Sequence, residues 1–144
     1  MCSKRLLPAV MIIAILAAVI GGDSALSETA PHAAQFQPVN IRITCAGDDV
    51  DDVNIRPWVA HVSQGQSQQL RWQLAGGGVG SVSIQPKSNS AWPFASTPPI
   101  AVTAGGPGTA SGAITGGQGA YYYDIIADCG SGPTVIDPRM DIDP

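Results

Sequence analysis

Basic residues and histidines are scarce in this chain. Its 144 residues include seven lysines and arginines, eleven aspartates and glutamates, and two histidines, so the net charge is −4. A protein that binds nucleic acid neutralises phosphates with a basic patch. The sequence offers no such patch, and we therefore expect no nucleic-acid partner.

The sequence also lacks the motifs of known catalytic and phosphate-binding sites. Its serines stand in no G-x-S-x-G or S-x-x-K pattern. The run A-G-G-G-V-G at residues 75–80 has neither the lysine nor the following helix that a phosphate loop requires. We expect no enzymatic activity and no cofactor; a hydrolase with an unrecognised site ranks last among our hypotheses.

Helical periodicity is missing beyond the first twenty residues. Lys4 and Arg5 precede an apolar run from Leu6 to Ile20, as in a secretory signal. Small residues follow, so cleavage after Ser27 is expected, with a cut after Gly22 as an alternative. An uncleaved anchor is the other interpretation, because the 17 residues from 6 to 22 reach the lower limit of a membrane span. The protein would then contact the membrane only through this segment.

These features predict three parts: a signal peptide at residues 1–27, a flexible lead at 28–38 and a folded domain at 39–144. A chain starting at Glu28 would carry five basic and ten acidic residues, a net charge of −5. The expected location is the periplasm or the medium. The sequence does not distinguish between these two.

Only three cysteines are present. Cys2 lies ahead of the apolar run and would leave with the signal peptide, which leaves Cys45 and Cys129. An even pair in an exported chain predicts a disulfide. The alternative is two free, buried thiols.

Alternation of apolar and polar residues is the main structural signal. Residues 39–45 alternate strictly, with Val39, Ile41, Ile43 and Cys45 on one side, which is typical of a half-buried strand. Further strands are predicted at 54–63, 68–74, 81–86, 100–104, 121–129 and 134–142, with a weak one at 109–115.

Turn signals suggest how these strands connect. Residues 46–52, which contain D-D-V-D-D, are predicted as a loop, and Q-G-Q-S at 64–67 as the turn of a hairpin. Trp58 is expected to face the same side as Ala60 and Val62, and Asp137-Pro138 to place the last strand at a sheet edge. The expected fold is an all-β antiparallel sandwich, immunoglobulin-like or cupredoxin-like, of about seven strands with one disulfide.

Four phrases within residues 53–142 carry a family resemblance: V-N-I-R-P-W-V-A-H-V-S-Q-G-Q-S-Q-Q-L-R-W-Q-L, W-P-F, Y-Y-Y-D-I-I-A-D-C and V-I-D-P-R-M-D-I. They resemble small exported bacterial proteins of unknown function with a cupredoxin-like or immunoglobulin-like sandwich. The resemblance implies a fold and no activity.

A metal site has weak candidates. Blue copper needs a thiolate and two imidazoles, and no histidine follows Cys129, so only His61 and Met140 remain. Oxygen ligands for calcium are offered by four residues, Asp48, Asp49, Asp51 and Asp52, but without the spacing and the distal glutamate of an EF-hand. A solvated acidic segment is the preferred interpretation, and a metal-handling cupredoxin-like protein is the alternative function.

Aromatic residues make the most interesting surface candidates. In Tyr121–Tyr123, Tyr122 must point opposite to its neighbours, so it is predicted to be exposed if Ile125 is buried. Trp92, Phe94 and Tyr122 form the predicted binding surface, with core packing as the alternative. The leading hypothesis is an exported, non-enzymatic binding or structural module for a protein or carbohydrate partner.

Overall fold

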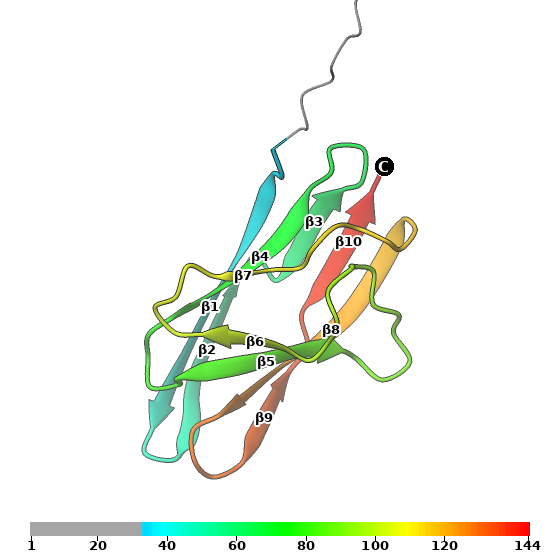
Figure 1. Ribbon diagram of the computed structural model, residues 1–144. Coiled ribbons are helices and arrows are strands. Elements are labelled where there is room, and N and C mark those ends of the chain that lie inside the picture. The colour runs from blue at the N-terminus through cyan, green and yellow to red at the C-terminus, as the bar shows by residue number, and fades with distance from the viewer. Residues whose placement is uncertain (1–32) are drawn as a thin grey trace, which may run out of the picture. The chain divides into compact units, whose positions relative to one another are not determined.

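Residues 33–144 form β-strands and no helix in the computed structural model (Figure 1). The predicted signal segment and the first part of the predicted lead lie outside these described residues. Ten strands are present where about seven were expected: β1 Phe36–Ala46, β2 Asp49–Arg56, β3 Val59–Ser63, β4 Gln69–Ala75, β5 Ser81–Pro86, β6 Ile100–Thr103, β7 Thr109–Ala110, β8 Gly119–Asp128, β9 Pro133–Ile136 and β10 Arg139–Asp143. No helix among residues 33–144 has the length and apolarity that crossing a membrane requires.

The strands are arranged in two sheets. The first has the order β2-β1-β4-β7, and the second has the order β3-β10-β8-β5-β6. Strand β8 is the longest of the second sheet and is bordered by β10 along its first half and by β9 along its second half (Figure 1). Strands β1 and β4 run parallel, as do β3 and β10, so the fold is mixed and not purely antiparallel as predicted.

One apolar core lies between the sheets. Because side chains alternate along a strand, every second residue of each long strand points inward. The alternating apolar residues of four strands are buried: Val39, Ile41 and Ile43 of β1, Leu70, Trp72 and Leu74 of β4, Val82 and Ile84 of β5, and Tyr123 and Ile125 of β8. Cys45 and Tyr121, on the same sides of β1 and β8, are only partly buried. The largest fully buried side chains include Trp72, Tyr123, Ile41, Ile43, Leu70, Ile84, Ile125 and Met140. The Trp72 and Tyr123 rings meet edge to face with centroids 6.1 Å apart, which joins the two sheets directly.

The acidic segment was wrongly predicted as a loop. Strand β2 begins at Asp49 and pairs antiparallel with β1, so D-D-V-D-D lies mostly in a strand. The turn is reduced to Gly47 and Asp48, with Gly47 at a φ of 63°. Glycine adopts this left-handed conformation at little cost, which allows such a tight turn.

The predicted hairpin at Q-G-Q-S is also wrong. Strand β3 pairs with β10 in the second sheet, whereas β4 pairs with β1 in the first. The turn itself exists, because the Ser67 N–H donates to the Gln64 carbonyl at 3.1 Å. It carries the chain from one sheet to the other.

Two prolines separate strands instead of lying within them. Pro57 stands between β2 and β3, and Trp58 lies before β3, so the predicted alternation does not extend back to it: Trp58 is 49% exposed, whereas Ala60 and Val62 are buried. Pro138 stands between β9 and β10 and divides the predicted last strand. Strand β10 lies between β3 and β8, so it is not at the edge as predicted, whereas β9 pairs with β8 alone. Neither proline removes a hydrogen bond from an inner ladder.

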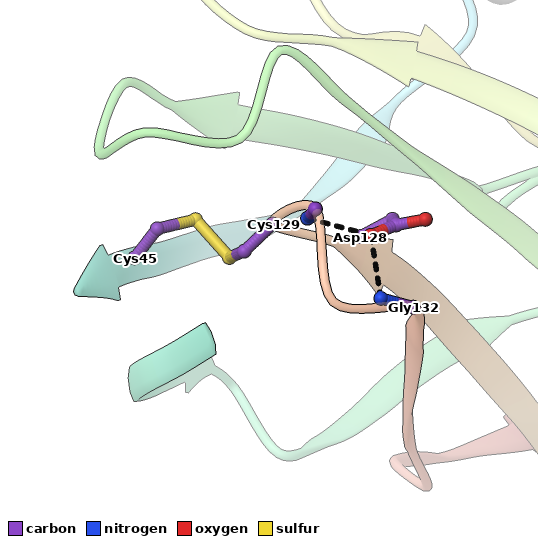
Figure 2. Close-up of a disulfide and its surroundings, with 5 residues drawn as sticks. Cys45, Asp128, Cys129 and Gly132 are labelled. Atoms are coloured by element: carbon purple, nitrogen blue, oxygen red, sulfur yellow. Dashed lines mark hydrogen bonds between the residues drawn. A yellow bond between two sulfur atoms is a disulfide. The ribbon is translucent and has the colours of Figure 1, made fainter. Parts of the chain in front are cut away.

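The predicted disulfide is present. Cys45, near the end of β1, is bonded to Cys129, in the turn after β8, with Cα atoms 5.8 Å apart (Figure 2). The Asp128 carboxylate accepts hydrogen bonds from the Gly130 and Gly132 N–H groups at 2.7 and 3.3 Å, which shapes the turn that presents Cys129. The bridge therefore ties the first sheet to the second.

Candidate functional site

A surface hollow of about 450 Å³ lies beside the first half of β8. One wall is the loop Lys87–Ala91, which follows β5, and the other is the segment Gln118–Tyr122. The hollow is open to solvent, and its volume falls in the range typical of small-ligand sites, roughly 300–1,000 Å³. We call it the β8 hollow.

Tyr122 stands at this hollow with its ring exposed. It is 48% exposed, whereas Tyr123 is fully buried and Tyr121 is partly buried. The predicted alternation through the three tyrosines is therefore present. The Tyr121 hydroxyl donates to the Gly117 carbonyl at 2.8 Å, which holds the segment that leads into β8 against the strand.

Two hydrogen bonds hold the walls together. The Lys87 N–H donates to the Tyr122 carbonyl at 3.1 Å, and the Tyr122 N–H donates to Ser90 Oγ at 3.1 Å. The Ser90 N–H closes the loop by donating to the Lys87 carbonyl at 2.8 Å. Asn89, between them, has a φ of 72°, a conformation that asparagine tolerates better than most residues.

A lysine and two carboxyl groups lie next to the hollow. Lys87 Nζ is 2.8 Å from Asp137 Oδ1, which raises the pKa of Lys87. The pKa of Asp137 is lowered mainly by its hydrogen bond with the Lys87 ammonium and, to a smaller extent, by a hydrogen bond with Asp124. The pKa of Asp124 is raised mainly by burial and, to a smaller extent, by its hydrogen bond with Asp137. The hollow is lined by Lys87 but by neither aspartate, so this carboxyl pair neutralises the lysine and does not face the hollow.

A second ion pair lies across the ladder from Tyr122. Arg139 of β10 is paired in register with Tyr122, and its Nη2 donates to Asp141 Oδ2 at 2.9 Å. This hydrogen bond raises the pKa of Arg139. The Asp141 carboxylate thus offsets the charge of Arg139 beside the ring, although Arg139 Nε has no hydrogen-bond partner among the described residues.

The other two residues of the predicted binding surface lie elsewhere. Phe94 is 4% exposed, and Trp92 is partly buried. Trp92 stacks on Trp72 with centroids 6.0 Å apart and meets Phe94 edge to face at 5.6 Å. Phe94 is therefore a core residue, and Trp92 closes the same aromatic cluster; of the three, Tyr122 is the one whose ring faces solvent.

The weak metal candidates do not converge. Met140 is fully buried, whereas His61 is exposed and lies beside Asp141 in the β3–β10 register. His61 Nδ1 is 3.1 Å from Asp143 Oδ2, at the outer surface. The side chains of His61 and Met140 therefore point to opposite faces of the second sheet.

The acidic segment likewise gathers no ligand set. Asp48 lies in the turn, and its carbonyl accepts from the Ser131 N–H at 2.9 Å. Asp49, Asp51 and Asp52 are exposed along β2. Within residues 33–144 no three histidine, cysteine, aspartate or glutamate side chains are grouped so that they could hold a metal ion.

The chain has no significant match among protein-family models, curated proteins or solved structures. The resemblance to small exported sandwich proteins therefore stays a prediction.

The sequence predicted the exposed Tyr122 side chain but not the other residues that line the hollow. Ser88, Asn89, Ser90 and Gln118 carry no motif, and the two walls are about thirty residues apart in the chain. The one available signal was S-N-S after the β5 strand, a composition that marks a turn and nothing about a site.

Proposed function

We propose that this protein is an exported, non-enzymatic binding module that uses the β8 hollow as its ligand site. The observation that supports this most strongly is the half-exposed Tyr122 ring beside a hollow of about 450 Å³. Tyrosine offers a large, rigid contact area with a polar end, which is why it is common in binding sites. The partner classes are a carbohydrate or a protein of the cell envelope or the medium.

We further propose that the two sheets form a sandwich of the immunoglobulin-like or cupredoxin-like type. Their shared core and the edge-to-face contact of Trp72 with Tyr123 support a two-layer arrangement. In such folds binding residues lie on loops and strand ends supported by a rigid core. The β8 hollow has this position, since Tyr122 directly precedes the buried Tyr123.

Export to the periplasm or the medium, with removal of residues 1–27, is part of the same proposal. The Cys45–Cys129 disulfide supports it, because such bonds persist in oxidising compartments. Mass spectrometry of the protein recovered from a secreting bacterial host should find a chain that begins at Glu28. A full-length chain in the membrane fraction would contradict cleavage.

Binding is tested by capture from the envelope fraction of a secreting cell. Immobilised wild-type protein and Tyr122→Phe should retain the same component, and Tyr122→Ala should lose it. Val135→Ala is the matched control, because Val135 is 54% exposed on β9 and does not line the hollow. A capture profile that is the same for wild type and Tyr122→Ala would refute the proposed site.

A further inference from the structure

We propose that the β8 hollow binds a neutral saccharide, with the sugar ring stacked on the Tyr122 side chain. This inference rests on the proposed function and names the ligand class of the same site. It follows from the polar groups that line the hollow, from its charge and from the part of β8 that remains open.

The lining groups match the chemistry of sugar hydroxyls. Two serines and two amides, Ser88, Ser90, Asn89 and Gln118, line the hollow. Hydroxyl and amide side chains both donate and accept hydrogen bonds, as hydroxyl groups of a sugar do. The Ser90 hydroxyl already accepts from the Tyr122 N–H and donates to the Ala91 carbonyl at 3.4 Å, which leaves Ser88, Asn89 and Gln118 to bind the ligand. The exposed Tyr122 ring supplies the apolar surface on which the C–H face of a pyranose can lie.

The charge of the site favours a neutral ligand. Lys87 is the one ionic side chain that lines the hollow, apart from the tyrosines, and Asp137 holds its ammonium at 2.8 Å. Arg139, across the ladder from Tyr122, is bonded to Asp141. An anionic sugar would find no free cation here, and a cationic ligand would find no free carboxylate in the lining.

The open part of the strand edge is too short for a peptide strand. The N–H and C=O groups of Tyr122 are already bonded to Ser90 Oγ and the Lys87 N–H. Backbone groups alternate along a strand, so those of the exposed Ala120 point to the same side as those of Tyr122. One accessible pair at Ala120 can bind a hydroxyl, whereas strand addition requires several successive pairs.

The test is a titration of the isotope-labelled protein, purified as exported, followed by backbone amide chemical shifts. The neutral probes are cellotetraose, maltotetraose, xylotetraose, mannotetraose and tetra-N-acetylchitotetraose. Tetragalacturonic acid is the anionic probe, and an extended threonine-rich peptide is the probe for strand addition. At least one neutral probe should shift the amides of residues 87–91 and 118–122 in a saturable manner.

Variants separate stacking from folding. Tyr122→Ala should weaken binding about tenfold or more, and Tyr122→Phe should keep it, because the ring supplies the contact. Asn89→Gly removes the amide but keeps the positive φ, and Gln118→Ala removes the second amide; each should weaken binding by a smaller factor. Val135→Ala should leave binding unchanged.

Three results would each overturn the saccharide assignment. In the first, no neutral probe shifts these amides. In the second, a neutral probe shifts them equally in wild type and Tyr122→Ala. In the third, the anionic or the peptide probe binds more tightly than every neutral probe. The two proposals can fail separately. If Tyr122 is needed to capture an envelope component but no neutral probe shifts these amides, the saccharide assignment is wrong and the proposed function stands. If the Tyr122-dependent component is missing too, both fall.

Discussion

The Tyr122 N–H donates a hydrogen bond to Ser90 Oγ at 3.1 Å, across 32 positions of the chain. It is a contact between a strand edge and a loop side chain, and both residues line the β8 hollow. This hydroxyl is therefore one of the two hydrogen-bonding groups that hold the walls of the hollow together, beside the Lys87 N–H.

The first prediction concerns this hydroxyl. Ser90→Ala should raise the exchange rate of the Tyr122 amide proton about fivefold, because the N–H loses its acceptor. The protein should stay folded, since a single partly exposed hydrogen bond contributes about 1 kcal/mol. Ser88→Ala is the matched control at the other serine of the loop. Equal protection of the Tyr122 amide in both variants would contradict the contact.

The second prediction concerns the disulfide. The bond joins residues 84 positions apart, so the double variant Cys45→Ala/Cys129→Ala should lose about 4 kcal/mol of unfolding free energy in the chain-entropy model. Urea denaturation, followed by tryptophan fluorescence, measures the difference. The bridge would be refuted if the unreduced native protein were alkylated at both thiols, with no loss of stability in the variant.

The third prediction concerns Tyr123 at alkaline pH. Burial raises the pKa of Tyr123, and the neighbouring Trp72 indole lowers it by a smaller amount, so the resulting pKa is about 12. The folded pKa lies above the unfolded value of about 10, so this group favours folding below pH 10 and that contribution is lost as the pH rises toward 12. The loss at pH 11.5 should be about 2 kcal/mol.

Tyr123→Phe isolates this effect. The Tyr123 hydroxyl has no hydrogen-bond partner among the described residues, so its removal should change stability at pH 8 by less than about 1 kcal/mol. Urea midpoints of both proteins at pH 8 and pH 11.5 give the comparison. The wild type should lose more stability than the variant over this range, and parallel losses would show that Tyr123 is not buried as described.

The fourth prediction concerns a glycine against β4. At Gly108, φ is +84°, and a Cβ would lie 2.8 Å from the Trp72 carbonyl oxygen. At Gly105, φ is +69°, and a Cβ would meet nothing within 4 Å. Gly108→Ala should therefore be less stable than Gly105→Ala by about 1–3 kcal/mol, because only the first adds a backbone clash to the strain. Equal melting temperatures would place the β7 segment away from Trp72.

The sequence was sufficient to predict which residues face the core within a strand. Period-2 alternation predicted the burial of Val39, Ile41 and Ile43 in β1, and the exposure of Tyr122 between its neighbours. This works because alternation is a local consequence of strand geometry. The disulfide was predictable too, since the expected export and the expected loss of Cys2 left one pair of cysteines.

Strand pairing could not be read from the same pattern. Alternation in β3 and β4 is equally compatible with a hairpin and with strands in different sheets, and Q-G-Q-S turns the chain in either case. D-D-V-D-D forms a strand because β1 supplies a partner ladder, which overrides the low strand propensity of aspartate. The β8 hollow is a tertiary feature of the same kind, made where Lys87–Ala91 meets residues distant in sequence.

The most direct measurement places a photo-crosslinking p-benzoylphenylalanine at position 122 of the protein in living, secreting cells. The β8 hollow is proposed to be occupied there, so irradiation should give one dominant adduct that the same label at position 135 does not give. Excess of a neutral oligosaccharide identified by titration should reduce this adduct. No adduct at 122, or the same adducts at 122 and 135, would contradict a ligand site at Tyr122.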